Sequence, residues 1–291
     1  MSQPPSEPHV VVTGAAGYVG RHVVTALLER GFRTRAVVRP GRGGEIDVRA
    51  DVVEADIFAP DFQVASLVGE QTLALIHLAW EDGFVHNAPS HMLRLSSHFA
   101  FLSDAVAAGV QRLSVLGTMH EVGYWEGAID ADTPTAPRSL YGVAKDALRQ
   151  STQIALSDKV ELAWLRCYYI FGDDRRNNSI FARLLEAADR GQQSFPFTTG
   201  KSQYDFIDVA ELADQIAVAS VTPGVTGVIN CSSGEPVSLA TQVEAFIADN
   251  ALGIELEYGA FPDRPYDSPA VWGDATRIRQ IMAEYAATAH G

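Results

Sequence analysis

The sequence is poor in the residues on which several classes of protein depend. It has two cysteines in 291 residues, Cys167 and Cys231, and neither has the spacing of a metal knuckle or a redox pair. Both stand in apolar runs, so we expect buried, reduced thiols in a cytoplasmic protein without a metal site. No apolar run reaches the roughly 18 residues needed to span a membrane, and the first residues, MSQPPSEPH, lack the apolar core of a signal peptide.

Basic residues are also scarce. Lys and Arg total 22 against 36 Asp and Glu, which gives a formal net charge of −14. This balance argues against a nucleic-acid partner, because such proteins carry a basic face. An anionic ligand would need locally placed arginines or lysines.

What the chain does have is an alternation of apolar strands and periodic helices. Strands are predicted near residues 10–13, 32–38, 51–56, 73–79, 111–117 and 160–170, with helices between them, including 60–70, 90–108 and 139–156. This order predicts right-handed βαβ units and a Rossmann-type, doubly wound parallel sheet of the α/β class. The continuously apolar strands fit a sheet that is covered on both faces.

A glycine-rich turn separates the first strand from the first helix. In VVVTGAAGYVGRHVV, Gly14 permits a tight turn, Gly17 lets the backbone approach a pyrophosphate and Gly20 brings the helix close to the strand. The helix start then offers free N–H groups to the anion. The turn therefore predicts a dinucleotide site that includes these glycines, Tyr18 and Val19.

The end of the second strand bears on which dinucleotide is bound. A carboxylate there usually bonds the 2′-hydroxyl of NAD, but RTRAVVRPGRGG has no acid before Glu45. Arg39 stands in its place and suits a 2′-phosphate, so we favour NADP(H), with NAD(H) as the alternative. Asp56 and Ile57, which follow the third strand, are expected at the adenine edge.

The pattern becomes less regular after Gly172. We assign residues 1–8 to a disordered tail, 9–172 to an NAD(P)-binding Rossmann domain and 173–291 mainly to a smaller C-terminal substrate-binding lobe. Within the last region, the run 226–231 is a candidate to return to the sheet.

Four further motifs follow the glycine turn: LIHLAW, LYGVAK, YDFIDV and DRPYDSPAVWGD. With the G-x-x-G-x-x-G spacing, they resemble the extended short-chain dehydrogenase/reductases, especially the nucleotide-sugar epimerases, dehydratases and reductases, over nearly the whole chain. The first is similar to the family's H-L-A-A, which lines the cofactor, and this implies such a role for Leu78 and Ala79. The second carries the family's Y-x-x-x-K, and the last two resemble its R-D-F-I-H-V and R-P-x-D elements.

The Y-x-x-x-K pair, Tyr141 and Lys145, is the candidate for proton transfer in the site. Tyr141 and Lys145 are four residues apart and so lie on one face of a helix. A nearby ammonium lowers the pKa of a tyrosine from its usual value of about 10. The phenol can then exchange a proton with a substrate oxygen while hydride moves to or from a nicotinamide. The resemblance implies that Lys145 also holds the nicotinamide ribose and that Thr118 bonds the reacting oxygen.

The loop after Thr118 argues against one reaction. Family dehydratases have Thr-Asp-Glu here, whereas this chain has Thr118-Met119-His120-Glu121. Methionine stands in the Asp position and cannot donate a proton, so a 4,6-dehydratase is not expected. His120 and Glu121 are either substrate contacts or ordinary polar loop residues.

The resemblance also implies a nucleotide-diphosphate site in the C-terminal lobe. Asn178 opens a helix as the family's substrate-binding Asn does, and Arg264 and Asp267 match the residues that bind phosphate and ribose. Two positions depart from the family: Tyr204 replaces a second phosphate arginine, and Tyr169 replaces an Asn of many epimerases.

The favoured hypothesis is an NADP(H)-dependent reductase of a keto group in a nucleotide-activated sugar or a similar small carbonyl compound. The alternative is an epimerase with tightly bound NAD, because an epimerase recycles its cofactor and gains nothing from NADPH. A non-catalytic dinucleotide sensor is less favoured, because the chain keeps both Tyr141 and Lys145. The apolar stripe of the helix at 90–108 predicts a homodimer, although the same stripe can pack on its own sheet.

Overall fold

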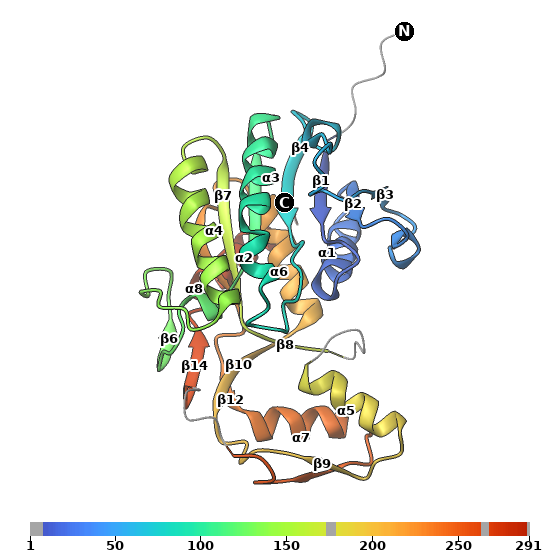
Figure 1. Ribbon diagram of the computed structural model, residues 1–291, viewed down its shortest axis with the longest axis vertical. Coiled ribbons are helices and arrows are strands. Elements are labelled where there is room, and N and C mark those ends of the chain that lie inside the picture. The colour runs from blue at the N-terminus through green and yellow to red at the C-terminus, as the bar shows by residue number, and fades with distance from the viewer. Residues whose placement is uncertain (1–7, 173–178, 263–267, 290–291) are drawn as a thin grey trace.

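The computed structural model of the protein describes residues 8–172, 179–262 and 268–289 (Figure 1). Its main feature is a seven-stranded parallel sheet in the order β11-β7-β5-β4-β1-β2-β3. The strands are β1 (His9–Thr13), β2 (Thr34–Val38), β3 (Asp51–Glu54), β4 (Thr72–His77), β5 (Arg112–Thr118), β7 (Glu161–Cys167) and β11 (Gly227–Cys231). This is the predicted Rossmann-type α/β fold, and the run 226–231 does return to the sheet as β11.

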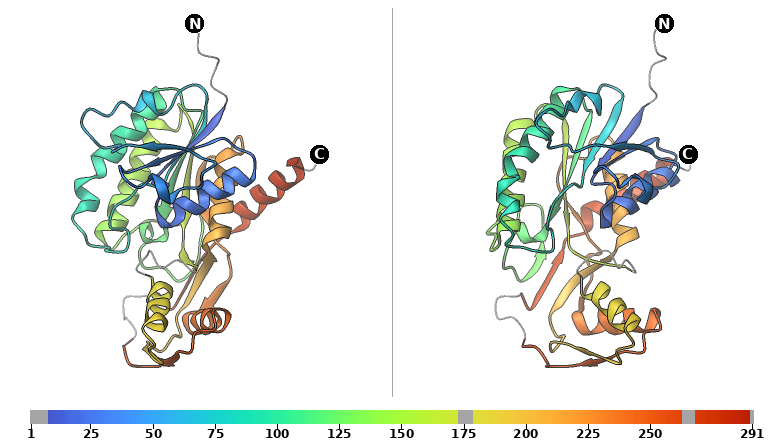
Figure 2. Two further views of the ribbon diagram at one scale, coloured as in Figure 1. Left: turned by 90° about the vertical axis from the view of Figure 1, so that its right-hand side faces the viewer. Right: turned by 45° about the vertical axis from the view of Figure 1, so that its right-hand side comes forward.

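Helices cover both faces of this sheet, as Figure 2 shows. One face carries α1 (Tyr18–Glu29), α6 (Val209–Val221) and α8 (Thr276–Ala289), and the other carries α3 (Leu95–Ala107) and α4 (Leu140–Leu156). The alternation of side chains along a strand explains the two layers. Val10 and Val12 of β1 enter the core under α1 and α6, while Val11 enters the core under α3 and α4, and all three are fully buried.

A smaller lobe lies at the carboxyl edge of the sheet (Figure 1). It holds a five-stranded sheet made of β6 (Gly127–Ile129), β8 (Tyr169–Phe171), β10 (Gln203–Asp208), β12 (Pro236–Ser238) and β14 (Ala270–Gly273). A two-stranded sheet of β9 (Ser194–Pro196) and β13 (Glu255–Glu257) and the helices α5 (Ile180–Asp189) and α7 (Leu239–Asp249) complete it.

The chain passes between the two units more than once after residue 172. The helices α5 and α7 pack together in the lobe, whereas α6, β11 and α8 belong to the large sheet and its covering layer. The large sheet and its covering layer are therefore completed by segments from the end of the chain.

Two predicted helices differ in the structure. The stretch 60–70 forms only the short 3-10 helix η2 (Val64–Ser66), and the two poorest helix formers, Pro60 and Gly69, lie near its ends. The helix expected over 90–108 is two helices, α2 (Ser90–Leu93) and α3, which meet at Arg94. A further short helix, η1 (Gly43–Glu45), follows β2.

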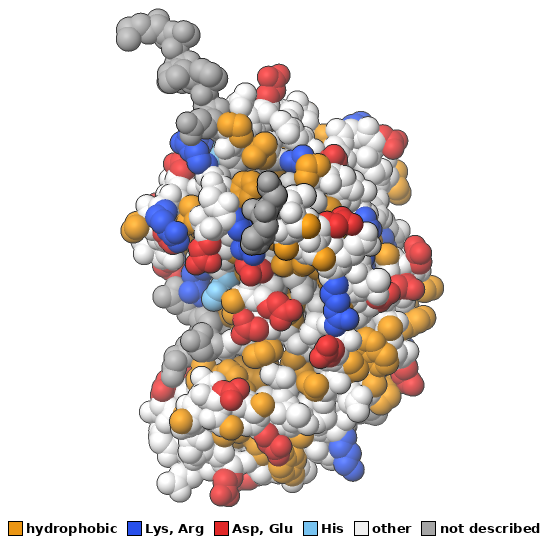
Figure 3. All heavy atoms as spheres, turned by 180° about the vertical axis from the view of Figure 1, so that it is seen from behind, with side chains coloured by type: hydrophobic (Ala, Val, Ile, Leu, Met, Phe, Trp, Pro, Cys, Tyr) orange, Lys and Arg blue, Asp and Glu red, His pale blue; other side chains and the backbone are white. Residues whose placement is uncertain are grey.

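The two cysteines are buried and free, as predicted. Across the described residues, no helix has both the length and the apolar character required to cross a bilayer. On the face shown in Figure 3, acidic and basic side chains are interspersed over both units rather than gathered by sign.

Candidate active site

The glycine-rich turn lies where the first strand meets the end of the fourth. Gly14 has a left-handed φ of 71°, and a Cβ there would lie 2.6 Å from the backbone nitrogen of Ala79. A Cβ on Gly20 would lie 2.2 Å from the Gly14 carbonyl oxygen. Gly17 caps α1 without a side-chain hydrogen bond, so the first amides of the helix remain available to an anion. These features fit the predicted pyrophosphate site.

The other residues predicted to hold the cofactor follow strands of the same sheet or open α1. They are Tyr18, Val19, Arg39, Asp56, Ile57, Leu78 and Ala79. Arg39 is exposed, and its Nη2 lies 2.5 Å from Oε1 of Glu81, which follows β4. Asp56 caps its own turn by accepting a hydrogen bond from the Phe58 amide at 3.0 Å. The arginine expected to read a 2′-phosphate is thus paired with a carboxylate.

The three predicted catalytic residues come together at the carboxyl end of β5. Thr118 ends that strand, and its side chain is hydrogen-bonded to Tyr141 near the start of α4. The Tyr141 amide donates to the His86 carbonyl at 2.8 Å, which holds the helix start against the loop after β4. One turn further along, Lys145 is buried and its Nζ donates to the Leu116 carbonyl of β5 at 2.7 Å.

Burial governs the ionisation of these groups. Desolvation, followed by the nearby Cys167, raises the pKa of Tyr141 above its usual value, and the hydrogen bond with Thr118 acts in the opposite direction. Tyr141 therefore holds its proton in the protein alone. Burial lowers the pKa of Lys145 to about 8, although Cys167 and Glu121 act to raise it. This places the ionisation of the ammonium close to neutral pH.

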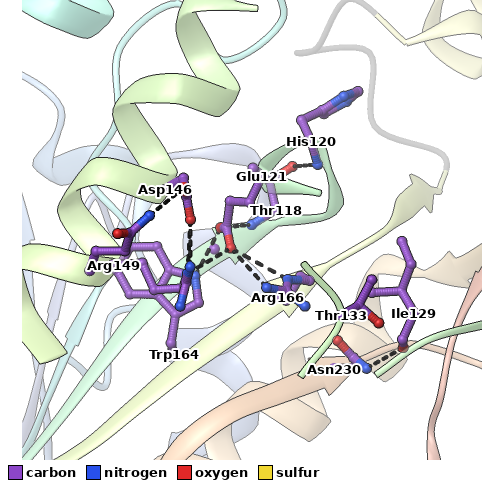
Figure 4. Close-up of polar contacts among 12 residues, drawn as sticks. Thr118, His120, Glu121, Ile129, Thr133, Asp146, Arg149, Trp164, Arg166 and Asn230 are labelled. Carbon is purple, nitrogen blue, oxygen red and sulfur yellow. Dashed lines mark hydrogen bonds and ion pairs between the residues drawn. The ribbon is translucent and has the colours of Figure 1, made fainter. Parts of the chain in front are cut away.

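Glu121 is a structural carboxylate (Figure 4). It is fully buried and accepts hydrogen bonds from the Thr118 amide at 2.7 Å and the Trp164 indole at 2.8 Å. The Arg166 guanidinium lies 3.3 Å away and that of Arg149 3.7 Å away. Burial raises the pKa of Glu121, and both arginines and the two hydrogen bonds oppose that rise. Glu121 thus fixes the end of β5 and the 3-10 helix η3 (Met119–Glu121), with its side chain in the protein interior.

A group of aromatic rings around Tyr141 was not anticipated from the sequence. The His86 ring stacks against Tyr141 with centroids 5.7 Å apart, and His91, His120 and Trp80 lie at 5.3, 5.9 and 6.1 Å. Burial lowers the pKa of His120 to about 4, so that ring is neutral at pH 7. The histidines of GFVHNAPSH and the tryptophan of LIHLAW were the available signal, but no periodicity links them.

The predicted substrate residues Asn178, Arg264 and Asp267 lie outside the described residues. The two positions that depart from the family pattern are described. Tyr169 and Tyr204 stack with centroids 4.3 Å apart in the lobe core, where Tyr204 is buried. Within the described ranges, no group of three or more His, Cys, Asp and Glu side chains is arranged to hold a metal ion.

The comparison with known proteins agrees with this architecture. Residues 10–232 match the NAD dependent epimerase/dehydratase family. The chain belongs to that family. Its members include extended short-chain dehydrogenase/reductases, so the resemblance seen in the motifs is confirmed.

Among curated proteins, the chain is 43% identical to dTDP-6-deoxy-L-talose 4-dehydrogenase (NAD(+)) of Aggregatibacter actinomycetemcomitans, over 91% of this chain and 99% of that one. It is 26% identical to UDP-arabinose 4-epimerase 1 of Arabidopsis thaliana, over 96% of this chain and 75% of that one.

Solved structures share the fold at lower identity. A UDP-glucose 4-epimerase superposes with a TM-score of 0.83 at 17% identity, over 94% of this chain and 91% of that one. The UDP-glucuronic acid 4-epimerase of Bacillus cereus, in complex with UDP-glucuronic acid and NAD, gives 0.77 at 19% identity over 94% and 93%. These likenesses support the Rossmann-type fold.

Proposed function

We propose that this protein is a nicotinamide-dependent oxidoreductase that interconverts a carbonyl and a hydroxyl group at C4 of a dTDP-linked 6-deoxyhexose. The observation that carries the proposal is the convergence of Thr118, Tyr141 and Lys145 at the carboxyl end of β5. The 43% identity to a dTDP-6-deoxy-L-talose 4-dehydrogenase, across almost the whole of both chains, supports the substrate class.

The nicotinamide, when bound, supplies or accepts the hydride. The Thr118 and Tyr141 hydroxyls together bind the reacting sugar oxygen. Because burial raises the pKa of Tyr141, the phenol keeps its proton and can donate it to a carbonyl oxygen. Lys145, whose ammonium is held at the Leu116 carbonyl, would bind the nicotinamide ribose.

The glycine turn and the start of α1 would hold the pyrophosphate, and Arg39 would lie near the adenosine ribose. The expectation of NADP(H) rests on this arginine. Two observations favour NAD(H) instead: Glu81 pairs with Arg39 at 2.5 Å, and the 43% identical relative is named as an NAD(+) enzyme. We therefore propose NAD(H) as the working cofactor, with NADP(H) bound more weakly.

Binding of the nucleotide diphosphate by Asn178, Arg264 and Asp267 stays a prediction.

The formation of a homodimer also stays a prediction. Phe101 and Leu102 of α3 pack against the sheet, whereas Ile154 of α4 is 86% exposed and would suit a helical interface. Analytical ultracentrifugation of the wild type and of Ile154→Glu tests this: the proposal expects a dimer that the variant weakens.

The decisive experiment uses the purified protein, a dTDP-4-keto-6-deoxyhexose and NADH. We expect loss of absorbance at 340 nm with formation of the 4-hydroxy sugar, identified by NMR, and almost no turnover by Tyr141→Phe.

An epimerase is the second candidate, favoured by the 26% identity to a UDP-arabinose 4-epimerase. Interconversion of sugar epimers without added cofactor, with no net NADH consumption from the keto sugar, would replace the proposal by that alternative.

A further inference from the structure

Trp80 lies directly beneath the active site, three residues after the end of β4. It is the last residue of His-Leu-Ala-Trp, at the position where the similar H-L-A-A motif has alanine. The indole is partly buried and packs against the core under α3 and α4. A side chain of this size in place of a methyl group fills space next to α4.

The ring of Trp80 is fixed by its neighbours. Its Nε1 donates a hydrogen bond to Nδ1 of His91 at 3.0 Å, and the His98 ring stacks on it with centroids 4.4 Å apart at 19°. His98 is held in turn by His77, whose Nε2 lies 2.9 Å from its Nδ1, and His77 is bound to the Thr13 hydroxyl at 2.8 Å. The hydrogen bonds from Thr13 through His77 fix the His98 ring on which the indole stacks, and the bond to His91 fixes the edge of the indole, so the indole has little freedom to rotate.

Lys145 meets the face of this ring. Its Nζ lies 3.9 Å from the Trp80 ring centroid, within the range of a strong cation–π contact. Lys145 is 3% exposed, and the one hydrogen-bond partner of its ammonium among the described residues is the Leu116 carbonyl. The carboxylate of Glu121 also favours the charged lysine, but the Arg166 guanidinium already pairs with that carboxylate. The indole therefore supplies stabilisation that the buried cation obtains from few other groups.

We propose that Trp80 is a positioning residue of the active site, whose indole face keeps the Lys145 ammonium charged and held at the Leu116 carbonyl near the end of β5. The proposal deepens the function proposed above, in which Lys145 binds the nicotinamide ribose. The contact itself is independent of which sugar the enzyme takes.

The titratable groups that face Lys145 determine whether its own titration can be measured separately. Burial lowers the pKa of His98 to about 3 and that of His77 well below its usual value, and it raises the pKa of the Cys167 thiol to about 12. These groups keep their neutral forms between pH 7 and 10. Glu121 is bound by arginines and fully enclosed. Burial also raises the pKa of Tyr141, which contacts the Trp80 ring, and the ε-methylene signal of Lys145 follows the loss of a proton from its own ammonium group directly.

The chain has only three lysines, Lys145, Lys159 and Lys201, so a direct measurement is practical. Lysine labelled with ¹³C at Cε gives three methylene signals, which Lys159→Arg and Lys201→Arg assign. In the wild type, the Lys145 ε-protons should be shifted upfield by the indole ring current. Ordinary shifts at that position overturn the proposal, and this outcome needs no variant at Trp80.

A pH titration of the same signals tests the electrostatic part. Trp80→Leu keeps an apolar side chain but removes the ring face, and should increase the acid dissociation constant of Lys145 about tenfold. Trp80→Phe, which retains a ring, should lie between that variant and the wild type. Circular dichroism and urea denaturation of each variant report whether it is folded. An unchanged Lys145 titration in folded Trp80→Leu overturns the proposal.

Turnover gives a second readout. The alkaline loss of kcat should move to lower pH in Trp80→Leu and recover toward the wild type in Trp80→Phe. Trp125→Leu, a change in the lobe, is the matched control and should leave the profile where it is. Because the NMR measurement uses neither sugar nor cofactor, absence of activity on dTDP sugars would refute the proposed function while the Lys145 titration still decides the role of Trp80.

Discussion

The two sides of the β5 end differ in how their polar groups are satisfied. On the inner side, Glu121 is enclosed and bonded by the Thr118 amide, an indole and two guanidinium groups. On the outer side, Tyr141 and Lys145 have few hydrogen-bond partners and are surrounded by aromatic rings. The inner network is satisfied and so has a structural role. The outer groups are desolvated with shifted pKa values, which is the usual condition of groups that transfer protons.

The largest effect should come from the outer side. Tyr141→Phe removes the proton donor, and we expect kcat to fall about 10²- to 10⁴-fold, with little change in unfolding free energy. Steady-state kinetics and urea denaturation measure the two quantities. Tyr124→Phe is the matched control, because Tyr124 is an exposed tyrosine that bonds Glu126 at the surface. Unchanged turnover in Tyr141→Phe would refute the catalytic assignment.

The inner side should lose stability instead. Glu121→Gln leaves the Arg166 guanidinium buried without its counter-charge, and we expect a loss of about 3–5 kcal/mol in unfolding free energy. The exposed Glu126→Gln should change stability by less than about 0.5 kcal/mol. If Glu121→Gln had wild-type stability but little turnover, the Glu121 carboxylate would have a catalytic role, and the assignment of the inner network to structure alone would be wrong.

The pH should move activity and stability in opposite directions. The pKa of Lys145 is lowered to about 8 in the folded protein from an unfolded value near 10.5. Between these values the unfolded chain binds more protons, so the contribution of Lys145 to stability rises with pH. Its ammonium is lost over the same range, and turnover should fall above pH 8. Urea denaturation at pH 7.5 and 9.5 tests this: the rise in stability should be smaller in Lys145→Met.

The smallest effects should come from the exposed ion pair at the cofactor end. Glu81→Gln should alter stability by less than about 1 kcal/mol, because exposed pairs contribute little. It frees Arg39, so the affinity for NADP⁺ should rise several-fold while that for NAD⁺ stays constant. Fluorescence titration measures both affinities, with Arg42→Ser as a control at a neighbouring arginine. If NADP⁺ affinity responds to neither Glu81→Gln nor Arg39→Ser, Arg39 does not read the 2′-phosphate.

The parts of this molecule that the sequence predicts are those with local signals. The glycine turn, the Tyr141–Lys145 spacing and the strand that returns at 226–231 are each encoded within a few residues. The rings around Tyr141 are not, because Trp80 and His86 lie in the loop after β4 and His91 lies in the short helix α2, with no periodicity that links them, and they reach the tyrosine only through the fold.

Glu121 illustrates the same limit. Its loop position is compatible with a substrate contact, and nothing local gives the direction of its side chain. That direction is set by Trp164 and Arg166 on β7, more than 40 residues away. Long-range partners therefore separate a structural carboxylate from a catalytic one.

The order in which the chain builds its sheet has a consequence for its synthesis. The strands β1 to β7 are complete by residue 167, yet the edge strand β11 and the covering helix α8 lie at 227–231 and 276–289. A growing polypeptide on the ribosome therefore exposes the apolar face that Ile278 and Ile281 later cover until translation is almost finished. Loss of α8 would therefore leave the glycine turn complete while this apolar face of the sheet stays uncovered.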